Sequence, residues 1–210
     1  MNGRLVIAID GPSAAGKGTL ARRLAAHFQL PHLDTGLLYR AVGLKAEKSG
    51  RPAGEIAAGL QLSDLADPDL RTDRAGQAAS KVAALPEIRS NLLNFQKKFS
   101  SQSSGAVLDG RDIGTVICPD APVKLFVTAS SDARAERRYQ ELRALGLDTI
   151  KPRVLAEMAE RDRRDSERAA APLRAAPDAF LLDTSDMDAD AAFAAALAFI
   201  ERKGFRFSGP

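Results

Sequence analysis

The chain of 210 residues has little of several residue types that mark other classes of protein. It contains no Trp, and aromatic residues make up 5% of the sequence, so a row of rings for stacking single-stranded nucleic acid is not expected. A single cysteine, Cys118, excludes an internal disulfide and suits a reducing compartment. The two histidines, His27 and His32, lack metal-ligand spacing. We assign both histidines structural roles and expect no protein-bound metal cluster.

Long apolar runs are also absent. No stretch approaches the ~20 apolar residues that a membrane-spanning helix needs. Asp10 interrupts the N-terminal apolar run too early for the hydrophobic region of a secretory signal. We therefore expect a cytoplasmic protein without membrane contact. The formal net charge is +3 and the sequence pI is about 9.2, with much of the basicity in a few Arg-rich stretches, so charge placement says more than the total.

Apolar, β-branched stretches alternate with helical patterns along the chain. This alternation predicts an α/β fold in which a five-stranded parallel sheet is covered by helices on both faces. Residues 51–79 are rich in Ala, Asp and Gly with weak periodicity, which predicts a peripheral insertion. The expected strands are 4–10, 31–36, 106–109, 122–129 and 179–185, and the expected helices are 17–30, 37–50, 86–99, 132–145, 153–169 and 188–203.

The stretch DGPSAAGKGT connects the first expected strand to the first expected helix. Gly11 and Gly16 allow backbone N–H groups to turn around phosphate oxygens, and Lys17 adds a positive charge for the β- and γ-phosphates. The helix that follows contributes the positive end of its dipole. Gly18 intervenes before Thr19, and this Gly-Lys-Gly-Thr form is that of nucleoside monophosphate kinases. The pattern indicates nucleotide binding and leaves the type of reaction open.

Further polar stretches point to the phosphate acceptor. VLDGRDIGTVICPDAPVKLF (107–126) places Asp109, Arg111 and Asp112 at the carboxyl end of a buried strand, where ligands bind in open α/β sheets. LDTGLLYRAV (33–42) begins a helix, SSDARAERRYQEL (130–142) is rich in arginine, and ERDRRDSERAAAPL (160–173) alternates arginines with acids. Any single arginine here could simply be a solvated helix residue or a member of an i,i+4 ion pair. Their combination favours a binding site.

These motifs, in this order, resemble those of the bacterial cytidylate kinases, and the match covers roughly residues 4–48 and 71–200. The resemblance implies transfer of the γ-phosphoryl group of ATP to CMP or dCMP, with Mg²⁺ bound through nucleotide phosphates and water. It also implies a monomer that binds no nucleic acid. The residues expected to hold ATP are Gly11, Pro12, Ser13, Ala14, Ala15, Gly16, Lys17, Gly18 and Thr19.

The resemblance also assigns the acceptor site. Ser80, Arg89 and Asp112 would read the cytosine edge with Arg168 nearby, and this is chemically complementary, since Asp faces the exocyclic amine and Arg the ring acceptors. Arg161 and Asp165 would reach the ribose, while Tyr39, Arg40 and Arg111 would approach the phosphate. The full set of expected acceptor residues is Thr35, Tyr39, Arg40, Ser80, Arg89, Arg111, Asp112, Arg161, Asp165 and Arg168.

The expected catalytic residues are Lys17, Arg40, Arg111 and Arg161 for charge neutralisation, with Asp109 orienting the metal through its water shell. A mobile cover must exclude water, and we place it at 143–165. The resemblance implies a core of 1–35, 86–142 and 166–210 and an acceptor-binding insertion of 36–85. Four more arginines are candidates to close over the transferring phosphoryl group: Arg134, Arg137, Arg138 and Arg164.

The insertion departs from the family. The segment between Ser49 and Arg71 is shorter than usual and lacks strand alternation, so we expect the family's small antiparallel sheet to be trimmed or missing. Its loss would change the support of Ser80 and Arg89.

Three other functions fit parts of the pattern. One is a nucleoside monophosphate kinase with a broader UMP and CMP acceptor range. Another is a basic P-loop protein that binds nucleic acid, although the acids within ERDRRDSER interrupt any continuous basic track. The third is a GTPase, but the chain has no Asn-Lys-x-Asp guanine motif.

Overall fold

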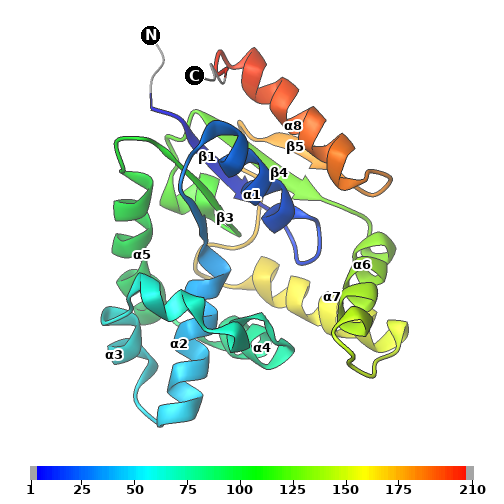
Figure 1. Cartoon of the computed structure of the whole chain (residues 1–210). Helices are drawn as coiled ribbons and strands as arrows, with labels where there is room; N and C mark the ends of the chain where they lie inside the picture. Colours follow the sequence, from blue (N-terminus) through cyan, green and yellow to red (C-terminus); the bar gives the residue numbers. More distant parts are fainter. Residues whose placement is uncertain (1–3, 207–210) are drawn as a thin grey trace.

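The computed structural model describes residues 4–206, apart from the side chain of Asp73, and is built on one five-stranded sheet (Figure 1). The strand order is β2-β3-β1-β4-β5 and every neighbouring pair is parallel, which confirms the predicted fold class. The strands are β1 (Val6–Asp10), β2 (His32–Asp34), β3 (Ala106–Gly110), β4 (Val123–Thr128) and β5 (Phe180–Asp183).

Helices connect the strands and cover the sheet. The α-helices are α1 (Lys17–Phe28), α2 (Thr35–Ser49), α3 (Ala53–Ala58), α4 (Asp73–Val82), α5 (Pro86–Ser100), α6 (Ser131–Ala144), α7 (Lys151–Glu167) and α8 (Ala189–Arg202). Two short 3-10 turns, η1 (Leu62–Ala66) and η2 (Pro68–Arg71), and one π-helical turn, η3 (Ile113–Ile117), complete the described part of the chain.

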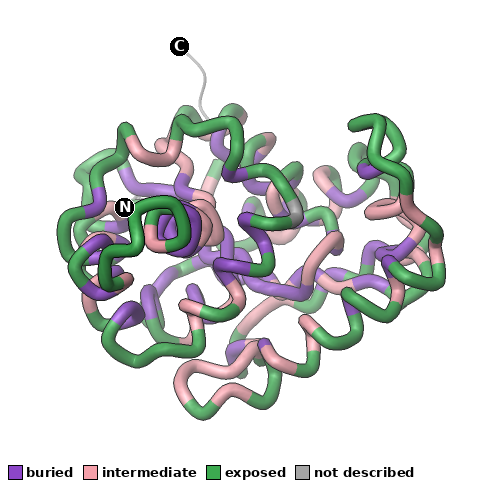
Figure 2. Tube along the Cα trace, turned by 90° about the horizontal axis from the view of Figure 1, so that it is seen from below, coloured by how far each residue is buried: buried purple, intermediate pink, exposed green. Residues whose placement is uncertain are grey.

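The two faces of the sheet belong to different cores. Ile7 and Ile9 point to a core with the apolar sides of α1 and α8, whereas Val6 and Ala8 point to a second core with α2, α5 and η3. This alternation follows from the period of two in a strand, and it explains why β1 is buried throughout and apolar as far as Ile9. Buried stretches run through the interior while the outer helical turns are exposed (Figure 2).

The region predicted as a peripheral insertion is helical. It forms α3, η1, η2 and α4 below the sheet in Figure 1, and the described residues contain no strand outside the parallel sheet. This agrees with the expected absence of the small antiparallel sheet, while the weak periodicity of 51–79 did not predict the short helices. The α4 helix packs closely on α2 because Gly43 has no side chain. A Cβ on Gly43 would lie only 2.8 Å from the Cβ of Ala78.

Most expected elements are present with small shifts at their ends. The first strand begins at Val6 rather than at residue 4, and the fifth spans Phe180–Asp183 rather than 179–185. The second helix starts at Thr35, where the Asp34 carboxylate accepts from the Gly36 N–H, and it ends at Gly50 in the left-handed conformation as predicted. No helix in the described part of the chain is long and apolar enough to cross a membrane.

The strands end together at the edge of the sheet where the polar motifs begin. Asp10 of β1 lies opposite Gly110 of β3, and Asp34 of β2 lies opposite Asp109. The phosphate loop after β1, the start of α2 and the turn after β3 therefore leave the sheet side by side. This places the three motifs within reach of one another.

Candidate active site

The phosphate loop depends on glycine where its backbone passes β4. Gly11 has φ +147°, and a Cβ there would lie 1.9 Å from the Val127 carbonyl oxygen, so no other residue fits. Gly16 has φ +88° and faces open space at the start of α1. No side chain caps this helix, and no acidic residue lies in its first turn. The first N–H groups of α1 are therefore available to an anion.

Lys17 lies inside the loop. Its Nζ donates to the Pro12 carbonyl at 2.6 Å, and the side chain is buried. Burial lowers the pKa of Lys17 to about 7, and the charge of Arg111 acts in the same direction. A phosphate group beside Lys17 would oppose both effects, because a nearby anion favours the charged ammonium.

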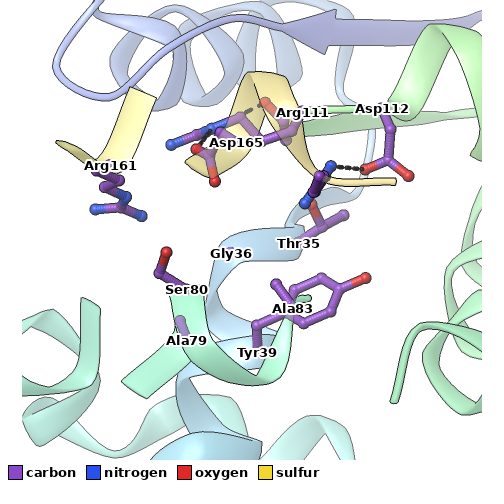
Figure 3. Close-up of a pocket in the computed structure, with 12 residues that line it drawn as sticks. Thr35, Gly36, Tyr39, Ala79, Ser80, Ala83, Arg111, Asp112, Arg161 and Asp165 are labelled. Atoms are coloured by element: carbon purple, nitrogen blue, oxygen red, sulfur yellow. Dashed lines mark hydrogen bonds and ion pairs between the residues drawn. The ribbon is translucent and has the colours of Figure 1, made fainter. Parts of the chain in front are cut away.

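A second polar cavity lies beyond the loop, between the carboxyl end of β3 and the insertion. Figure 3 shows Arg111, Asp112, Arg161 and Asp165 on one side of it, facing Ser80 of α4 and Tyr39 of α2 on the other. Eight of the ten expected acceptor residues line this cavity: Thr35, Tyr39, Ser80, Arg111, Asp112, Arg161, Asp165 and Arg168.

Asp112 is held between two arginines at the floor of this cavity. Arg89 of α5 donates to Asp112 Oδ2 in a buried ion pair, and Arg168 Nη2 lies 3.5 Å from Asp112 Oδ1. Arg89 also lies over the Tyr39 ring, at 5.8 Å from its centre. Although Arg89 does not line the cavity, it orients the carboxylate that does.

A second ion pair joins the turn after β3 to α7. Arg111 Nε donates to Asp165 Oδ2 at 2.8 Å. Burial opposes ionisation of both groups and is the largest single effect on Asp165, but the charges of Arg111 and Arg161, with the hydrogen bond from Arg111, together outweigh it and lower the pKa of Asp165. The charge of Asp165 in turn raises the pKa of Arg111 against the same burial.

Arg161 is the least compensated cation near this pair. Burial, followed by the charge of Arg111, lowers the pKa of Arg161 to about 10. Its buried Nε has no hydrogen-bond partner among the described residues. A group at the cavity that accepts hydrogen bonds and carries negative charge would satisfy Arg161.

Arg40, like Arg89, is an expected acceptor residue that does not line the cavity. Its Nη1 donates to the carbonyls of Leu70 at 2.7 Å and Thr72 at 3.3 Å, so it anchors the insertion to α2. Its guanidinium nevertheless faces Gly76, as does that of Arg161. The positive charge of Arg40 therefore adds to that at this end of the cleft.

Asp109 lies one strand away from the phosphate loop and pairs with His32. His32 Nε2 is 2.7 Å from Asp109 Oδ1, and the Thr35 hydroxyl donates to the Asp109 carbonyl at 2.8 Å. The sequence analysis gave His32 only a structural role and did not connect it with the site. Because these residues meet through the pairing of β2 with β3, their separation of 77 positions hides the contact.

The arginines expected to close over the phosphoryl group have protein partners here. Arg134 is buried and donates to Asp162 of α7 at 2.6 Å and to the Ser13 carbonyl of the phosphate loop at 3.3 Å. Arg137 donates to Thr184, Arg138 pairs with Glu141, and Arg164 donates to Gln77 of α4 at 3.2 Å. In this structure Arg134, Arg137 and Arg164 link α6 and α7 to their surroundings, whereas the pair of Arg138 with Glu141 lies within α6.

A further pocket on the other side of the phosphate loop was missed by the sequence analysis. It lies between the loop, the end of β4 and the segment after β5, and its floor is held by Arg137, which donates to the carbonyls of Thr184 and Met187. Nothing in the local sequence marks it, because its residues are small or unremarkable: Ala15, Gly16, Thr19, Leu20, Val127, Arg137, Thr184, Met187, Asp188, Ala189 and Ala192.

Comparison with solved structures identifies related folds. An uncharacterized protein of Eubacterium ventriosum superposes with a TM-score of 0.58 at 18% identity, covering 97% of this chain and 100% of that protein. A gluconokinase of Sinorhizobium meliloti superposes with a TM-score of 0.51 at 16% identity, covering 95% and 94%. At these identities the likeness is one of fold.

Sequence comparison is more specific. The model of the family described as cytidylate kinase matches residues 7–67 and 59–202. Cytidylate kinases of Cereibacter sphaeroides and Paramagnetospirillum magneticum are each 60% identical to this chain over 198 and 207 residues, covering 94% of it and 96% and 98% of those proteins. The family model and the two relatives each cover most of the chain, and they show that it belongs to the cytidylate kinase family.

Proposed function

We propose that this protein transfers the γ-phosphoryl group of ATP to CMP or dCMP, giving ADP and CDP or dCDP. The observation that carries the proposal is the polar group at the acceptor cavity, where Asp112 is held by the buried Arg89 and the half-buried Arg168. An ionised carboxylate accepts hydrogen bonds only, so it suits the exocyclic amine of cytosine and repels the carbonyl of uracil.

Two buried polar atoms of the expected base-reading residues support this assignment. Ser80 Oγ and Arg89 Nη1 have no hydrogen-bond partner among the described residues. Leaving such atoms unpaired is costly, and a ligand that pairs with them recovers that cost. The ring nitrogen and carbonyl of cytosine are acceptors of the right kind. Arg168, which also donates to the Ala171 carbonyl at 2.6 Å, would hold the outer side of the base pocket.

The rest of the acceptor nucleotide would lie towards the arginines. Arg161 and Asp165 of α7 would contact the ribose, while Arg111, Arg40 and Tyr39 would lie near the phosphate. Thr35 starts α2 between the two regions, at the junction of β2 and the cavity. The cationic excess at Arg161 favours a doubly charged phosphate there, because opposite charges in a partly buried site attract strongly.

ATP would lie with its phosphates on the loop of residues 11–19. The pocket between the loop and the segment after β5 is continuous with the loop at Gly16 and Thr19, so it would receive the adenosine. Its apolar wall of Leu20, Val127 and Ala192 suits an aromatic base, and the polar groups at Thr184 and Asp188 suit the edge of that base.

The residues at the start of α1 suit a Mg²⁺ ion whose ligands would be mainly phosphate oxygens of the nucleotide and water molecules. The described residues hold no cluster of three or more His, Cys, Asp or Glu side chains that could bind a metal ion. The hydroxyl of Thr19 and the carboxylate of Asp109, which faces Gly18, are hard oxygen donors at the start of α1. When bound, Mg²⁺ neutralises charge on the phosphates of ATP.

The chemistry asked of this chain is positioning and charge neutralisation. An oxygen of the CMP phosphate is already ionised near neutral pH, so no strong base is required. Lys17 would draw charge from the donor phosphates, and Arg111 and Arg161 would hold the acceptor phosphate in line with the bond that breaks. Residues 143–165 would cover the cleft and keep water from attacking ATP.

A coupled assay of ADP release with ATP and Mg²⁺ tests the proposal directly, using CMP, dCMP, UMP, AMP and GMP as acceptors. CMP and dCMP should give the highest kcat/KM, and UMP should be poorer by roughly tenfold or more, because a buried carboxylate faces its carbonyl. Equal rates with UMP would support the broader pyrimidine kinase instead. Absence of CDP formation would contradict the proposal. We also predict that the protein is a monomer and that it is located in the cytoplasm.

A further inference from the structure

Asp10, which ends β1 immediately before the phosphate loop, is a buried carboxylate outside all the roles above. Its side chain accepts from two backbone N–H groups of the π-helical turn η3: Oδ1 from Ile113 at 2.7 Å and Oδ2 from Gly114 at 2.8 Å. The residue is only 3% exposed. Burial raises the pKa of Asp10 to about 6, opposed by these two N–H groups, so the carboxylate is ionised at neutral pH.

These two hydrogen bonds take the place of the side-chain cap that the residue before η3 does not provide. Asp112 occupies the position before η3 where an Asp usually accepts from the first N–H groups of its own helix. Its side chain makes no such bond. It points instead to Arg89 and Arg168 in the acceptor cavity. Asp10 therefore does the capping, and the Asp112 carboxylate is left to face the ligand.

Asp10 also holds the residues on the other side of Asp112. Its backbone lies opposite Gly110, the last residue of β3, in the β1–β3 register. The two residues between Gly110 and Ile113 are Arg111 and Asp112. One residue of β1 thus fixes both ends of the segment that carries these two acceptor groups, by its backbone at one end and by its carboxylate at the other.

We propose that Asp10 is a positioning residue for acceptor selection: by capping η3 from a neighbouring strand, it frees Asp112 to recognise the base and fixes where Arg111 projects. The inference rests on the assignment of Asp112 and Arg111 to the acceptor nucleotide. Asp10 itself touches neither substrate. Its effect should appear in the affinity for CMP and in the choice between CMP and UMP.

The variant Asp10→Asn tests this inference. An amide oxygen accepts as the carboxylate does, but the amide nitrogen would face the second N–H, so only one cap bond survives. The KM for CMP should rise about fivefold or more, the size of the loss of one cap interaction, while the KM for ATP stays within about twofold. The ratio of kcat/KM for CMP over UMP should fall with it. Hydrogen exchange at the Ile113 and Gly114 amides should become faster than in the wild type.

The matched control is Asp120→Asn, which makes the same chemical change at an exposed site beyond η3 and should leave all four readouts unchanged. If Asp10→Asn lowers only the Tm and keeps the wild-type KM for CMP and the wild-type selectivity, Asp10 is merely structural and the inference fails.

One further measurement keeps the inference testable if Asp10→Asn does not fold. Hydrogen exchange at the Ile113 and Gly114 amides of the wild-type protein should be slow, because both N–H groups donate to a buried carboxylate. Rapid exchange of these two amides would overturn the inference.

The assignment of the site can fail separately. If Asp112→Asn leaves the CMP over UMP ratio unchanged, Asp112 does not read the base, and the proposed site is wrong. If Asp112→Asn changes the ratio and Asp10→Asn does not, only the role of Asp10 is wrong.

Discussion

The donor and acceptor sides of the cleft are built from different parts of the polypeptide. The phosphate loop is one run of nine residues that presents main-chain N–H groups and a single lysine. The acceptor cavity draws side chains from α2, α4, α7 and the turn after β3, with Arg89 of α5 behind them. A single loop can be positioned by its own backbone, whereas a cavity assembled from separate elements needs contacts that hold those elements together.

On the acceptor side these contacts are ion pairs. On the donor side the phosphate loop is held by the close approach of Gly11 to the Val127 carbonyl of β4. Arg89–Asp112 and Arg111–Asp165 join elements that are 23 and 54 residues apart. Changes on the donor side should therefore affect the chemical step, while changes on the acceptor side should affect recognition. The following predictions test this division, from the largest expected effect to the smallest.

Lys17→Met should give the largest loss of turnover. It removes the charge that stabilises the donor phosphates, so kcat should fall by about 10³-fold, as for the loss of one transition-state electrostatic contact. The Tm should not fall, because Met replaces a buried lysine whose charged form is disfavoured there. CMP binding measured by calorimetry should be close to that of the wild type. A large loss of CMP affinity would contradict the separation of the two sides.

Arg161→Ala should reduce kcat/KM for CMP by roughly 10²-fold, because it removes the uncompensated cation near the acceptor phosphate. The KM for ATP should be nearly constant. Arg163→Ala is the control, since Arg163 lies on the same helix but is exposed and paired with Glu160 and Glu167. Steady-state kinetics with each substrate varied in turn separates the two effects. Intact CMP kinetics in Arg161→Ala would refute its role.

Asp112→Asn should lower the preference for CMP over UMP by roughly tenfold, the usual discrimination of one well-paired base contact. An amide can donate to the uracil carbonyl that a carboxylate repels. The measurement is the ratio of kcat/KM for the two acceptors, with the KM for ATP as internal control. An unchanged ratio would assign base selection to other groups.

Gly43→Ala should give a smaller effect that reaches the site through packing. The added methyl group would lie 2.8 Å from the Ala78 Cβ, so α4 must move away from α2, at a cost of roughly 1–3 kcal/mol. Because α4 carries Ser80, the KM for CMP should rise severalfold while the KM for ATP stays the same. Gly59→Ala, with 3.7 Å to its nearest neighbour, is the control. Thermal unfolding and acceptor kinetics measure both outcomes, and a lowered Tm with an unchanged KM for CMP would show that α4 does not position Ser80.

The contrast between the two sides also explains what could be predicted from the sequence. The phosphate loop is recognisable because its function depends on adjacent residues, and the strand and helix patterns around it predict the parallel sheet. The acceptor residues were named through family resemblance, and eight of them meet in one cavity. Resemblance could not reveal that Arg40 turns to the carbonyls of Leu70 and Thr72, since that contact depends on how this shorter insertion folds.

Other features had no local signal at all. His32 meets Asp109 because two strands pair in register, and the pocket proposed for adenosine is lined by single residues and short runs from separate segments of the chain. The helices of the insertion were not predicted because they have too few turns to show a period. They are held by apolar residues such as Ile56, Leu60 and Leu70, which lie in the core shared with α2, and by the close contact of α4 with Gly43.

Asp10 and Gly110 lie opposite each other in adjacent strands, and this register affects how the nucleotide-binding segments are placed. The segments that hold donor and acceptor leave the sheet at the same level and one strand apart, a spacing of about 4.8 Å set by main-chain pairing. Strand pairing therefore fixes where the two segments start, whereas Ser80 and Arg161 take their positions from the helices α4 and α7. A mutation that shifts either helix should change access to the cleft and the placing of the acceptor together.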